Sequence, residues 1–511
     1  MATVANALQD QEEVVAFLGR AESYGLKGEK IERHETHASI VFLAGERAYK
    51  LKRAVKYPYL DYSTPDKRRA MCEAELAINR RTAPKLYLEV RPIVQDARGL
   101  RFGSRDEHAQ AVDWVLVMRR FAQGDVLENL RRAGRLTRDL VLPLAETIAA
   151  FHDRAERIFT FGGESGMARV IEENAQILGR QPFARNKVDA LCAKSKAWLG
   201  RVGPLLEQRR RDGFVRRCHG DLHLNNICLL EGVPTPIDAI EFNDDIACID
   251  VWFDLAFLLM DLDRHGLRGP ANALFNRYLE KTFDSGGLTA LPLFLSCRAA
   301  IRAHVAMSAR ELGTGGQESE AAVLLDRAIE YLSPPPPRLV AVGGLSGTGK
   351  STLAYALAPL FGGAPGAVVL RSDILRKKIM GAEEHVRLSP SAYTSDVNAK
   401  VYGEMTRIAG HLLDAGCAVI ADAVHGARAE RDAIAAVARA HGVPFDGVWL
   451  RAPAEILESR VGKRTKDASD ADVGVLRRQI ATIAAAGDWQ MLDATGTSAE
   501  VLARARKHLG A

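Results

Sequence analysis

The stretch Gly344-Leu-Ser-Gly-Thr-Gly-Lys-Ser351 spells Gly-x-x-x-x-Gly-Lys-Ser. Such a loop needs glycines because its backbone N–H groups turn inward around a phosphate, and a Cβ would block that approach. The lysine reaches the β- and γ-oxygens, and the serine hydroxyl can hold Mg²⁺. Residues 338–343 resemble a buried strand and residues 350–360 the helix that follows it. We therefore expect ATP and Mg²⁺ as cofactors, with the nucleotide held by Gly344, Ser346, Gly347, Thr348, Gly349, Lys350, Ser351 and Thr352.

The chain after residue 337 alternates short apolar runs with longer amphipathic segments. Strands are expected at 338–343, 367–372, 417–422, 445–451 and 490–494. Helices are expected at 350–360, 395–415, 427–441, 454–463, 471–484 and 498–509. This alternation predicts an α/β domain whose parallel sheet is covered on both faces. Ligands bind at the carboxyl ends of the strands in such sheets, where the glycine-rich loop lies.

Further polar residues stand at the ends of these predicted strands. Asp373 and Arg376 follow the second strand, and Asp422 ends the third, where a carboxylate can hold Mg²⁺ through water. This arrangement resembles the small P-loop kinases of the polynucleotide kinase, gluconate kinase and zeta-toxin group. The resemblance implies that Asp373 faces the acceptor hydroxyl and that Arg376 binds an acceptor phosphate or the transferring group. Asp373 can instead be a helix cap.

Basic residues between 458 and 470 look like a kinase lid, because Arg460 and Arg464 are followed by Asp470. Guanidinium groups of a closing lid stabilise the negative charge of the phosphates. Arg460 can also be an ordinary residue of a charged helix face. We expect Arg460 to contact the nucleotide and Arg464 to act in catalysis.

Four prolines at 334–337 separate this half from the one before it. They cannot continue a helix, and they form a stiff extended spacer. We expect one domain at 1–332, a linker at 333–337 and a second domain at 338–511. Upstream, a hairpin at 39–52, a helix at 66–81 and strands at 89–95 and 111–119 predict a small sheet. The expected first domain is thus a small β-rich lobe, about 25–120, followed by a helical lobe, about 121–332.

The polar segment 217–245 contains Asp221, then Asn226 five residues later, then Asp238 after a short hairpin. Transfer from ATP to a hydroxyl needs a carboxylate for the acceptor's proton, and an amide and a second carboxylate for Mg²⁺. The motif His219-x-Asp221-x-x-x-x-Asn226 resembles that of the aminoglycoside phosphotransferase family. The resemblance implies Asp221 as catalytic base and Asn226 and Asp238 as metal ligands. It also implies that Asp254 is a structural brace.

A kinase-like small lobe also needs a lysine on its third strand, held by a glutamate on the helix. Ala48-Tyr49-Lys50 fits the strand, and Lys52 on the same face is the alternative. Glu75 is the expected partner, with Glu73 as the alternative. A glycine-rich phosphate-covering loop does not precede the lysine; His37-Ala38-Ser39 stands there instead. His219 is expected to be buried, and His223 is expected to lie on the surface.

Composition limits the remaining choices. The 511 residues are 47% hydrophobic and 26% charged, with a net charge of +5. Such a mild charge suits phosphorylated small molecules and does not indicate nucleic acid. Seven scattered cysteines without a Cys-x-x-Cys pair favour reduced thiols in the cytoplasm. The most apolar stretch, 251–260, is too short to span a bilayer, so no membrane partner is expected.

Taken together, these features predict an α+β two-lobed kinase-like domain followed by an α/β P-loop domain. We expect a bifunctional ATP-dependent phosphotransferase whose halves each phosphorylate a hydroxyl of a small molecule. One alternative is a single P-loop kinase with a regulatory or substrate-binding kinase-like module. Another is a P-loop half that phosphorylates the 5′-hydroxyl ends of nucleic acid.

Overall fold

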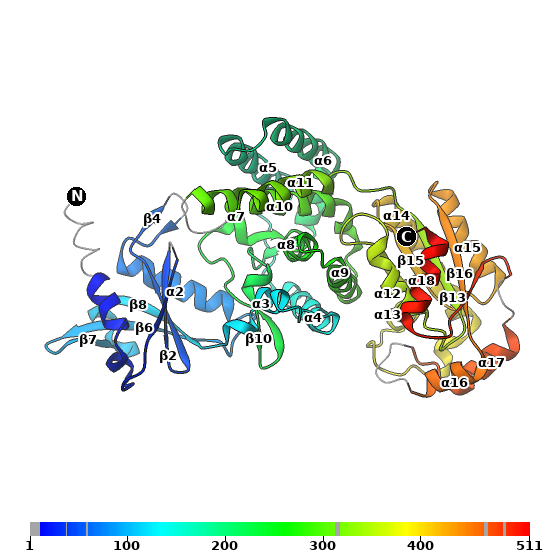
Figure 1. Cartoon of the computed structure of the whole chain (residues 1–511), viewed down its shortest axis with the longest axis horizontal. Helices are drawn as coiled ribbons and strands as arrows, with labels where there is room; N and C mark the ends of the chain where they lie inside the picture. Colours follow the sequence, from blue (N-terminus) through cyan, green and yellow to red (C-terminus); the bar gives the residue numbers. More distant parts are fainter. Residues whose placement is uncertain are drawn as a thin grey trace. The chain divides into compact units, whose positions relative to one another are not determined.

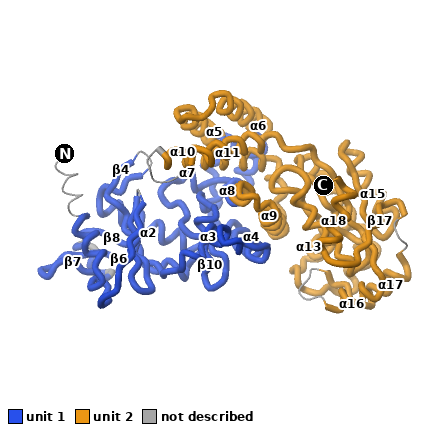
Figure 2. The backbone as a smooth tube through the Cα atoms, viewed as in Figure 1, with its two compact units in different colours: residues 1–167, 204–258 blue, residues 168–203, 259–511 orange. Residues whose placement is uncertain are grey.

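A computed structural model describes residues 11–36, 38–57, 60–311, 317–463, 469–483 and 487–510 (Figure 1). The chain folds into two compact units. Unit 1 comprises 1–167 and 204–258, and unit 2 comprises 168–203 and 259–511 (Figure 2). The domain limits at 333–337 rest on the sequence and stay a prediction.

The N-terminal part of unit 1 is a six-stranded antiparallel sheet with the order β1-β2-β3-β8-β6-β7. Its strands are β1 (Glu32–Glu35), β2 (Ser39–Ala44), β3 (Arg47–Lys52), β6 (Tyr87–Asp96), β7 (Gly99–Phe102) and β8 (Ala111–Arg119). Phe17 and Leu18 from the helical residues 11–18 pack with Phe42 on one face. Helix α2 (Pro65–Asn79) packs against the other face through Cys72, beside Trp114. The predicted hairpin, helix and small sheet are confirmed, and β1 and β7 extend the sheet.

The rest of unit 1 carries the polar segment between short strands. Strand β9 (Val215–Arg217) pairs with β12 (Cys248–Asp250), and β10 (Ile227–Leu230) pairs with β11 (Val233–Pro236). Residues 218–226 connect β9 to β10, and Asp238 follows β11. Other elements are β4 (Lys56–Tyr57), β5 (Leu60–Asp61), α3 (Leu127–Arg132), α4 (Arg138–Arg154) and α7 (Asp244–Ala247). Helix α8 (Val251–Arg264) begins in unit 1 and ends in unit 2. These two strand pairs therefore hold the segments that carry Asp221, Asn226 and Asp238.

Helices make up the first part of unit 2. They are α5 (Gly163–Arg180) and α6 (Arg185–Arg211), both shared with unit 1, and α9 (Arg268–Thr282), α10 (Leu291–Glu311) and α11 (Glu318–Tyr331). Among the described residues, Ser285–Arg310 is the one stretch whose length and apolar composition would allow it to cross a membrane. The structure buries 72% of its apolar window, as a core helix requires.

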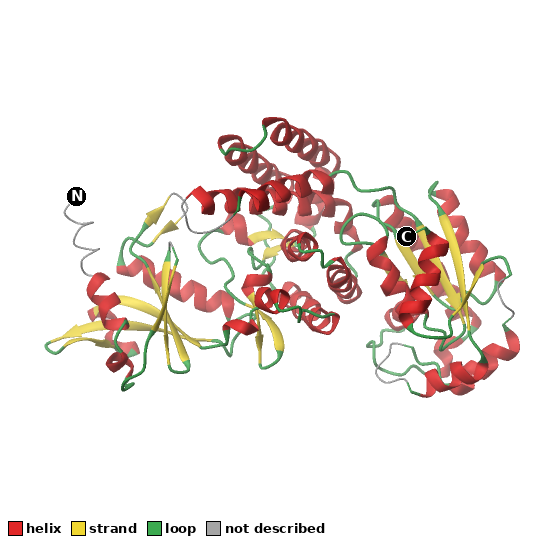
Figure 3. Cartoon of the chain, in the orientation of Figure 1, coloured by secondary structure: helices red, strands yellow, loops and turns green. Residues whose placement is uncertain are grey.

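The second part of unit 2 is a five-stranded parallel sheet with the order β14-β15-β13-β16-β17. Figure 3 shows strands of this part among helices. The strands are β13 (Leu339–Gly344), β14 (Val368–Arg371), β15 (Val419–Asp422), β16 (Phe445–Arg451) and β17 (Gln490–Asp493). The helices are α12 (Lys350–Leu357), α13 (Ser372–Ile379), α14 (Ser395–Asp414), α15 (Arg428–Ala440), α16 (Ala454–Gly462), α17 (Val473–Thr482) and α18 (Ser498–Leu509). The five predicted strands and six predicted helices are confirmed within a few residues, and α13 is additional.

Candidate functional site

In unit 1, the side chain of Lys50 joins two predicted site residues. Its Nζ lies 2.7 Å from Glu75 Oε1 and 2.8 Å from Asp238 Oδ1. Burial alone would lower the pKa of Lys50, but the carboxylates of Asp238 and Glu75 raise it well above its ordinary value. Lys50 is therefore a fixed positive charge between helix α2 and the loop that follows β11.

Lys52, the alternative lysine, lies deeper on the same face of β3. Its Nζ is 2.7 Å from Glu75 Oε2 and 2.6 Å from Glu241 Oε1, and its side chain is only 3% exposed. The alternative glutamate, Glu73, forms an exposed ion pair with Arg69 at 2.9 Å. Glu75 is thus the glutamate that both lysines contact, and Lys50 is the lysine that also reaches Asp238. The sequence did not single out Glu241, because the cluster forms only when β3 meets residue 241.

The loop around Asp221 is held by hydrogen bonds among its own residues. Asn226 Nδ2 donates to the Asp221 backbone carbonyl at 3.0 Å and to its Oδ2 at 2.8 Å. Because Asn226 uses its N–H groups on Asp221, its Oδ1 is the atom that it can offer a cation. His219 is buried: its Nδ1 accepts from Asp221 N–H and its Nε2 lies 2.8 Å from the Ile237 carbonyl. Burial lowers the pKa of His219, so it braces the loop as a neutral ring.

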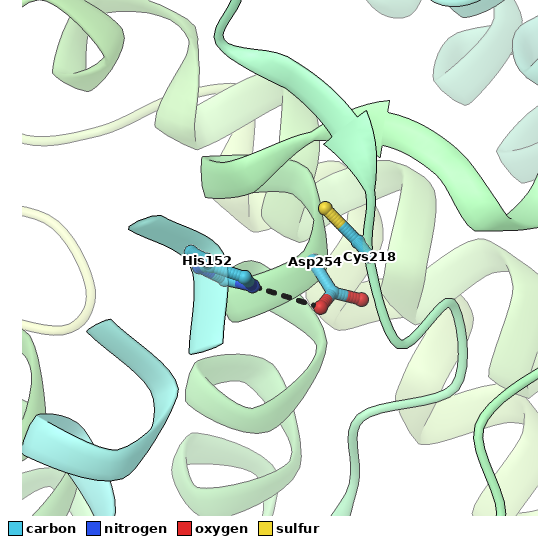
Figure 4. A group of neighbouring side chains, drawn as sticks. All are labelled: His152, Cys218 and Asp254. Atoms are coloured by element: carbon cyan, nitrogen blue, oxygen red, sulfur yellow. Dashed lines mark hydrogen bonds and ion pairs between the residues drawn. The ribbon is translucent and has the colours of Figure 1, made fainter. Parts of the chain in front are cut away.

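Asp254 braces the same loop from helix α8. Its carboxylate accepts from the backbone N–H groups of His219 at 3.1 Å and Gly220 at 2.8 Å. His152 Nε2 lies 3.0 Å from Asp254 Oδ2, and the Cys218 thiol is close by (Figure 4). Their potential metal-ligand atoms lie within 4.8 Å of one another. Burial raises the pKa of Cys218 well above its ordinary value, which favours a neutral thiol and a hydrogen-bonded brace.

His223 is buried, at 8% exposure, so the expectation that it lies on the surface was wrong. Its ring packs edge-on against Phe257, and its Nδ1 accepts from Asn225 N–H at 3.2 Å. Its Nε2 lies 3.3 Å from Asp221 Oδ2. Since Nδ1 accepts, the proton of the neutral ring must sit on Nε2 and point toward Asp221. No spacing rule in the sequence separates this histidine from a surface residue.

Asp238 has an uncommon backbone conformation, with φ of 60°. For a residue other than glycine such a conformation costs about 1–3 kcal/mol unless neighbours hold it. Its N–H donates to the Tyr87 hydroxyl at 3.0 Å, and the N–H of Ala239 donates to Asn79 Oδ1 at 2.9 Å. The half-exposed Asp238 carboxylate and the Asn226 amide oxygen are the kinds of ligand that Mg²⁺ prefers.

In unit 2, the glycine-rich loop joins β13 to α12 as predicted. Gly344 has φ of 137°, and a Cβ there would lie 2.6 Å from the Leu450 carbonyl oxygen. Thr348 is buried and its hydroxyl donates to the Leu345 carbonyl at 2.8 Å. Lys350 Nζ donates to that carbonyl at 3.1 Å. Gly344 and Thr348 therefore stabilise the conformation of the loop.

A cavity of about 1160 Å³ opens in front of this loop. It brings together predicted residues from four separate segments. Those that line it are Ser346, Gly347, Gly349, Lys350, Ser351, Thr352, Asp373, Arg376, Asp422 and Arg460. The predicted nucleotide, metal and acceptor residues of this half thus share one space.

Asp422 lies at the buried end of β15, beside Ser351. Burial raises the pKa of Asp422, whereas Arg371, Lys350 and a hydrogen bond from the Ser351 hydroxyl act to lower it. Arg371 Nε is 3.5 Å from Asp422 Oδ2. A hydroxyl and a carboxylate in contact next to the phosphate loop fit a Mg²⁺ site.

Arg376 lines the cavity on the side where the sequence predicts the acceptor. Its Nη1 donates to the Ala392 carbonyl at 2.7 Å, and its guanidinium lies 4.8 Å from the centre of the Tyr393 ring. Its buried Nε has no hydrogen-bond partner within the described part of the chain. Asp373, three residues earlier on α13, lines the same cavity. This side therefore offers both a carboxylate and an N–H donor.

The structure describes only part of the predicted lid. Arg460 donates to the carbonyls of Ala494 and Gly496 at 3.0 and 3.2 Å, and Arg464 lies outside the described residues. Asp470 contacts Lys377 at 2.8 Å, which anchors the lid to α13. Gln479 of α17 also lines the cavity, and its Oε1 accepts from the Ser346 N–H at 2.9 Å. Gln479 was not predicted, because a lone glutamine on a helix carries no signal in the sequence.

Comparison with known families identifies both halves. Residues 48–291 match the model of the phosphotransferase enzyme family, and residues 339–486 match that of an AAA domain. The first half thus has a kinase-like fold and the second a P-loop kinase fold, as predicted. Among solved structures, aminoglycoside 2'-phosphotransferase-IIIa is 12% identical and covers 62% of this chain and 98% of its own, with a TM-score of 0.40. A sugar kinase from Janibacter sp. HTCC2649 is 24% identical and covers 34% and 95%, with a TM-score of 0.27.

Two curated relatives match most of the chain. Uncharacterized protein Rv2004c of Mycobacterium tuberculosis (strain ATCC 25618 / H37Rv) is 30% identical over 415 residues, 78% of each chain. Uncharacterized protein Mb2027c of Mycobacterium bovis gives the same values. The chain therefore belongs to the family of these mycobacterial proteins, and it is an ATP-dependent phosphotransferase that combines a phosphotransferase-family domain with an AAA P-loop domain.

Proposed function

We propose that the chain is bifunctional, with each half transferring the γ-phosphoryl group of ATP to a hydroxyl of a small molecule. The observation that carries this proposal is the arrangement of Lys50 in the first half, which contacts both Glu75 and Asp238. A module that only binds or regulates does not need this pair of contacts, because their role in kinases is to position phosphates for transfer.

In the first half, Asp221 is the proposed proton acceptor. The acceptor's hydroxyl oxygen forms a bond to the γ-phosphorus, the bond from that phosphorus to the ADP oxygen breaks, and the hydroxyl proton passes to Asp221. Asn226 and Asp238 would hold Mg²⁺, which offsets the charge of the phosphates when bound. His223 keeps the Asp221 carboxylate in place through its Nε2.

In the second half, Asp373 is the proposed residue facing the acceptor. Lys350 would bind the phosphates, and Ser351 and Asp422 would hold Mg²⁺. The cavity of about 1160 Å³ exceeds the roughly 300–1,000 Å³ of a typical ligand pocket. It thus has room for a nucleotide together with a small acceptor. Arg376 Nε offers an N–H donor to an oxygen of that acceptor.

A regulatory role for the first half remains the second candidate. The observation in its favour is the sequence His37-Ala38-Ser39 ahead of Lys50, which lacks the glycines that normally cover the phosphates. We also propose a cytoplasmic location, because all seven cysteines are free.

The test uses the full chain and two single variants, Asp221→Asn and Lys350→Ala. ATP consumption is screened against sugars, aminoglycosides, nucleosides and 5′-hydroxyl oligonucleotides. If the chain is bifunctional, turnover of one acceptor should fall about 10²–10⁴-fold with Asp221→Asn and not with Lys350→Ala. Turnover of a second acceptor should be abolished by Lys350→Ala and not by Asp221→Asn. Calorimetry with Mg²⁺-ATP should give two binding events. A single binding event that Lys350→Ala abolishes would contradict bifunctionality. The chain would then be one P-loop kinase with an appended module.

A further inference from the structure

Strand β14 lies at the edge of the parallel sheet, next to β15. In a parallel ladder, alternate backbone groups of a strand point toward its neighbour and the others point away. Val368 N–H donates to the Ala418 carbonyl beside β15. The N–H of Val369 and the carbonyl of Ala367 are therefore the groups that face away from the sheet. Such groups need a partner when buried, and an uncovered edge also attracts other chains.

Asn276 of α9 supplies that partner within unit 2. Its Oδ1 accepts from Val369 N–H at 2.8 Å, and its Nδ2 donates to the Ala367 carbonyl at 3.1 Å. One side-chain amide thus takes the place that the peptide group of a neighbouring strand would occupy. Asn272, one turn earlier, adds a second donor to the Ala367 carbonyl at 3.0 Å. Both asparagine side chains are about 1% exposed, so water does not satisfy these groups.

The contact is specific in shape as well as in hydrogen bonds. Gly366, just before the strand, has φ of 124°. A Cβ at this position would lie 2.8 Å from Asn272 Nδ2 and 2.5 Å from the Ala358 carbonyl oxygen. A larger residue would therefore push α9 away from the strand.

Charged residues of α9 make further contacts with the P-loop part of unit 2. Arg277 Nη1 is 2.7 Å from Glu384 Oε2 and Lys281 Nζ is 3.3 Å from the same oxygen. The Tyr355 hydroxyl of α12 donates to Glu280 of α9. Helix α9 thus touches the edge strand, the helix that starts at the phosphate loop, and the segment after α13.

We propose that α9, a helix that matches the phosphotransferase family, is a fixed part of the P-loop kinase. Its amide pair completes the edge of β14, which ends at Arg371 and leads directly to Asp373 on the acceptor side of the cavity. The partner of this sheet edge is therefore a segment of the same chain. This inference does not depend on whether the first half is catalytic.

Hydrogen exchange of the full chain, read by mass spectrometry on peptides covering 366–373, tests the proposal. Asn276→Leu removes both hydrogen bonds. The Ala367 carbonyl keeps the bond from Asn272, but the buried N–H of Val369 is left unpaired. Such a group typically costs about 1–3 kcal/mol, so local opening should become about 5- to 150-fold more frequent. The control is Asn174→Leu, which removes a buried asparagine that donates to the Cys297 carbonyl in the helical part. It should leave exchange of 366–373 unchanged.

Asn276→Asp decides the question if Asn276→Leu does not fold. It keeps an acceptor for Val369 N–H but replaces the donor to Ala367 with an oxygen, so exchange should rise at least about threefold. Exchange within twofold of the wild type in a folded Asn276 variant overturns the proposal. So does an equal increase with Asn174→Leu, because the effect would then be general destabilisation.

Discussion

Lys50 and Lys52 both contact Glu75, yet the structure predicts opposite consequences for their loss. Lys52 is 3% exposed and also neutralises Glu241, whose side chain is 8% exposed. In Lys52→Met, Glu75 keeps Lys50 but Glu241 is left as a buried carboxylate beside the Tyr62 hydroxyl. Breaking a buried pair on one side costs about 3–5 kcal/mol. At about 2–4 °C per kcal/mol, the melting temperature of the first half should fall by roughly 6–20 °C.

Lys50→Met should cost much less stability. Glu75 keeps Lys52, and the Asp238 carboxylate is 52% exposed, so water can replace the lost partner. Losing such a half-exposed pair costs about 0–1 kcal/mol. Lys50 is, however, the lysine that reaches Asp238. Its loss should weaken phosphate binding and lower turnover in the first half by about 10²-fold or more.

Both variants are compared in a Lys350→Ala background, so that Mg²⁺-ATP binding reports on the first half alone. Calorimetry measures the affinity, and hydrogen exchange of β3 and α2 measures stability without assuming a two-state transition. We expect Lys50→Met to be folded and weak in ATP binding, and Lys52→Met to be unstable. If Lys50→Met proves the less stable and binds ATP normally, the assignment of the two lysines is reversed.

Substitutions at three further positions test single contacts. His223→Asn keeps an acceptor for Asn225 N–H but cannot reach Asp221, whereas His223→Gln keeps the donor to Asp221. Only His223→Asn should therefore lower kcat, by about tenfold, while the KM for ATP stays unchanged. An equal loss in both would assign His223 to folding alone. Asp422→Asn should raise the Mg²⁺ needed for half-maximal activity of the second half at least about tenfold. Burial raises the pKa of Asp422, and Mg²⁺ requires the ionised carboxylate. In the wild type, Mg²⁺ affinity should therefore begin to fall, as the pH decreases, at a pH above the usual pKa range of aspartate. An Mg²⁺ affinity that does not change with pH would contradict this site. Gly344→Ala should destabilise the second half by about 2–4 kcal/mol, since its Cβ would meet the Leu450 carbonyl at 2.6 Å; an unchanged melting curve would show that the loop relaxes freely.

The fold was accessible from the sequence because its signals are local. Strand β13 at 339–344 is a short apolar run, and the glycine-rich loop at 344–351 follows it directly. The sequence did not predict strands β1 and β7, because they lack such a local signal. The β1 sequence Glu-Arg-His-Glu is fully exposed and polar, so it has no alternation to detect, and only pairing with β2 makes it a strand.

The site was predicted where a motif fixes spacing and missed where the fold brings distant residues together. Asp221 and Asn226 are five residues apart, and their contact follows from that spacing. Lys52 and Glu241 are 189 residues apart, and no periodicity of either segment indicates that they meet. The choice between Lys50 and Lys52 was open for the same reason, because both lie on one face of β3. The contact that distinguishes them is the one between Lys50 and Asp238, which are 188 residues apart.

The contact of α9 with β14 affects how the proposed activities of the two halves can be tested separately. Cutting the chain at the prolines would remove Asn276 from the edge strand and leave Val369 N–H and the Ala367 carbonyl unpaired. A fragment 338–511 that lost activity or aggregated would then say nothing about the first half as a catalyst. Variants in the intact chain avoid this ambiguity, because Asp221→Asn and Lys350→Ala each change one centre and keep the sheet edge covered.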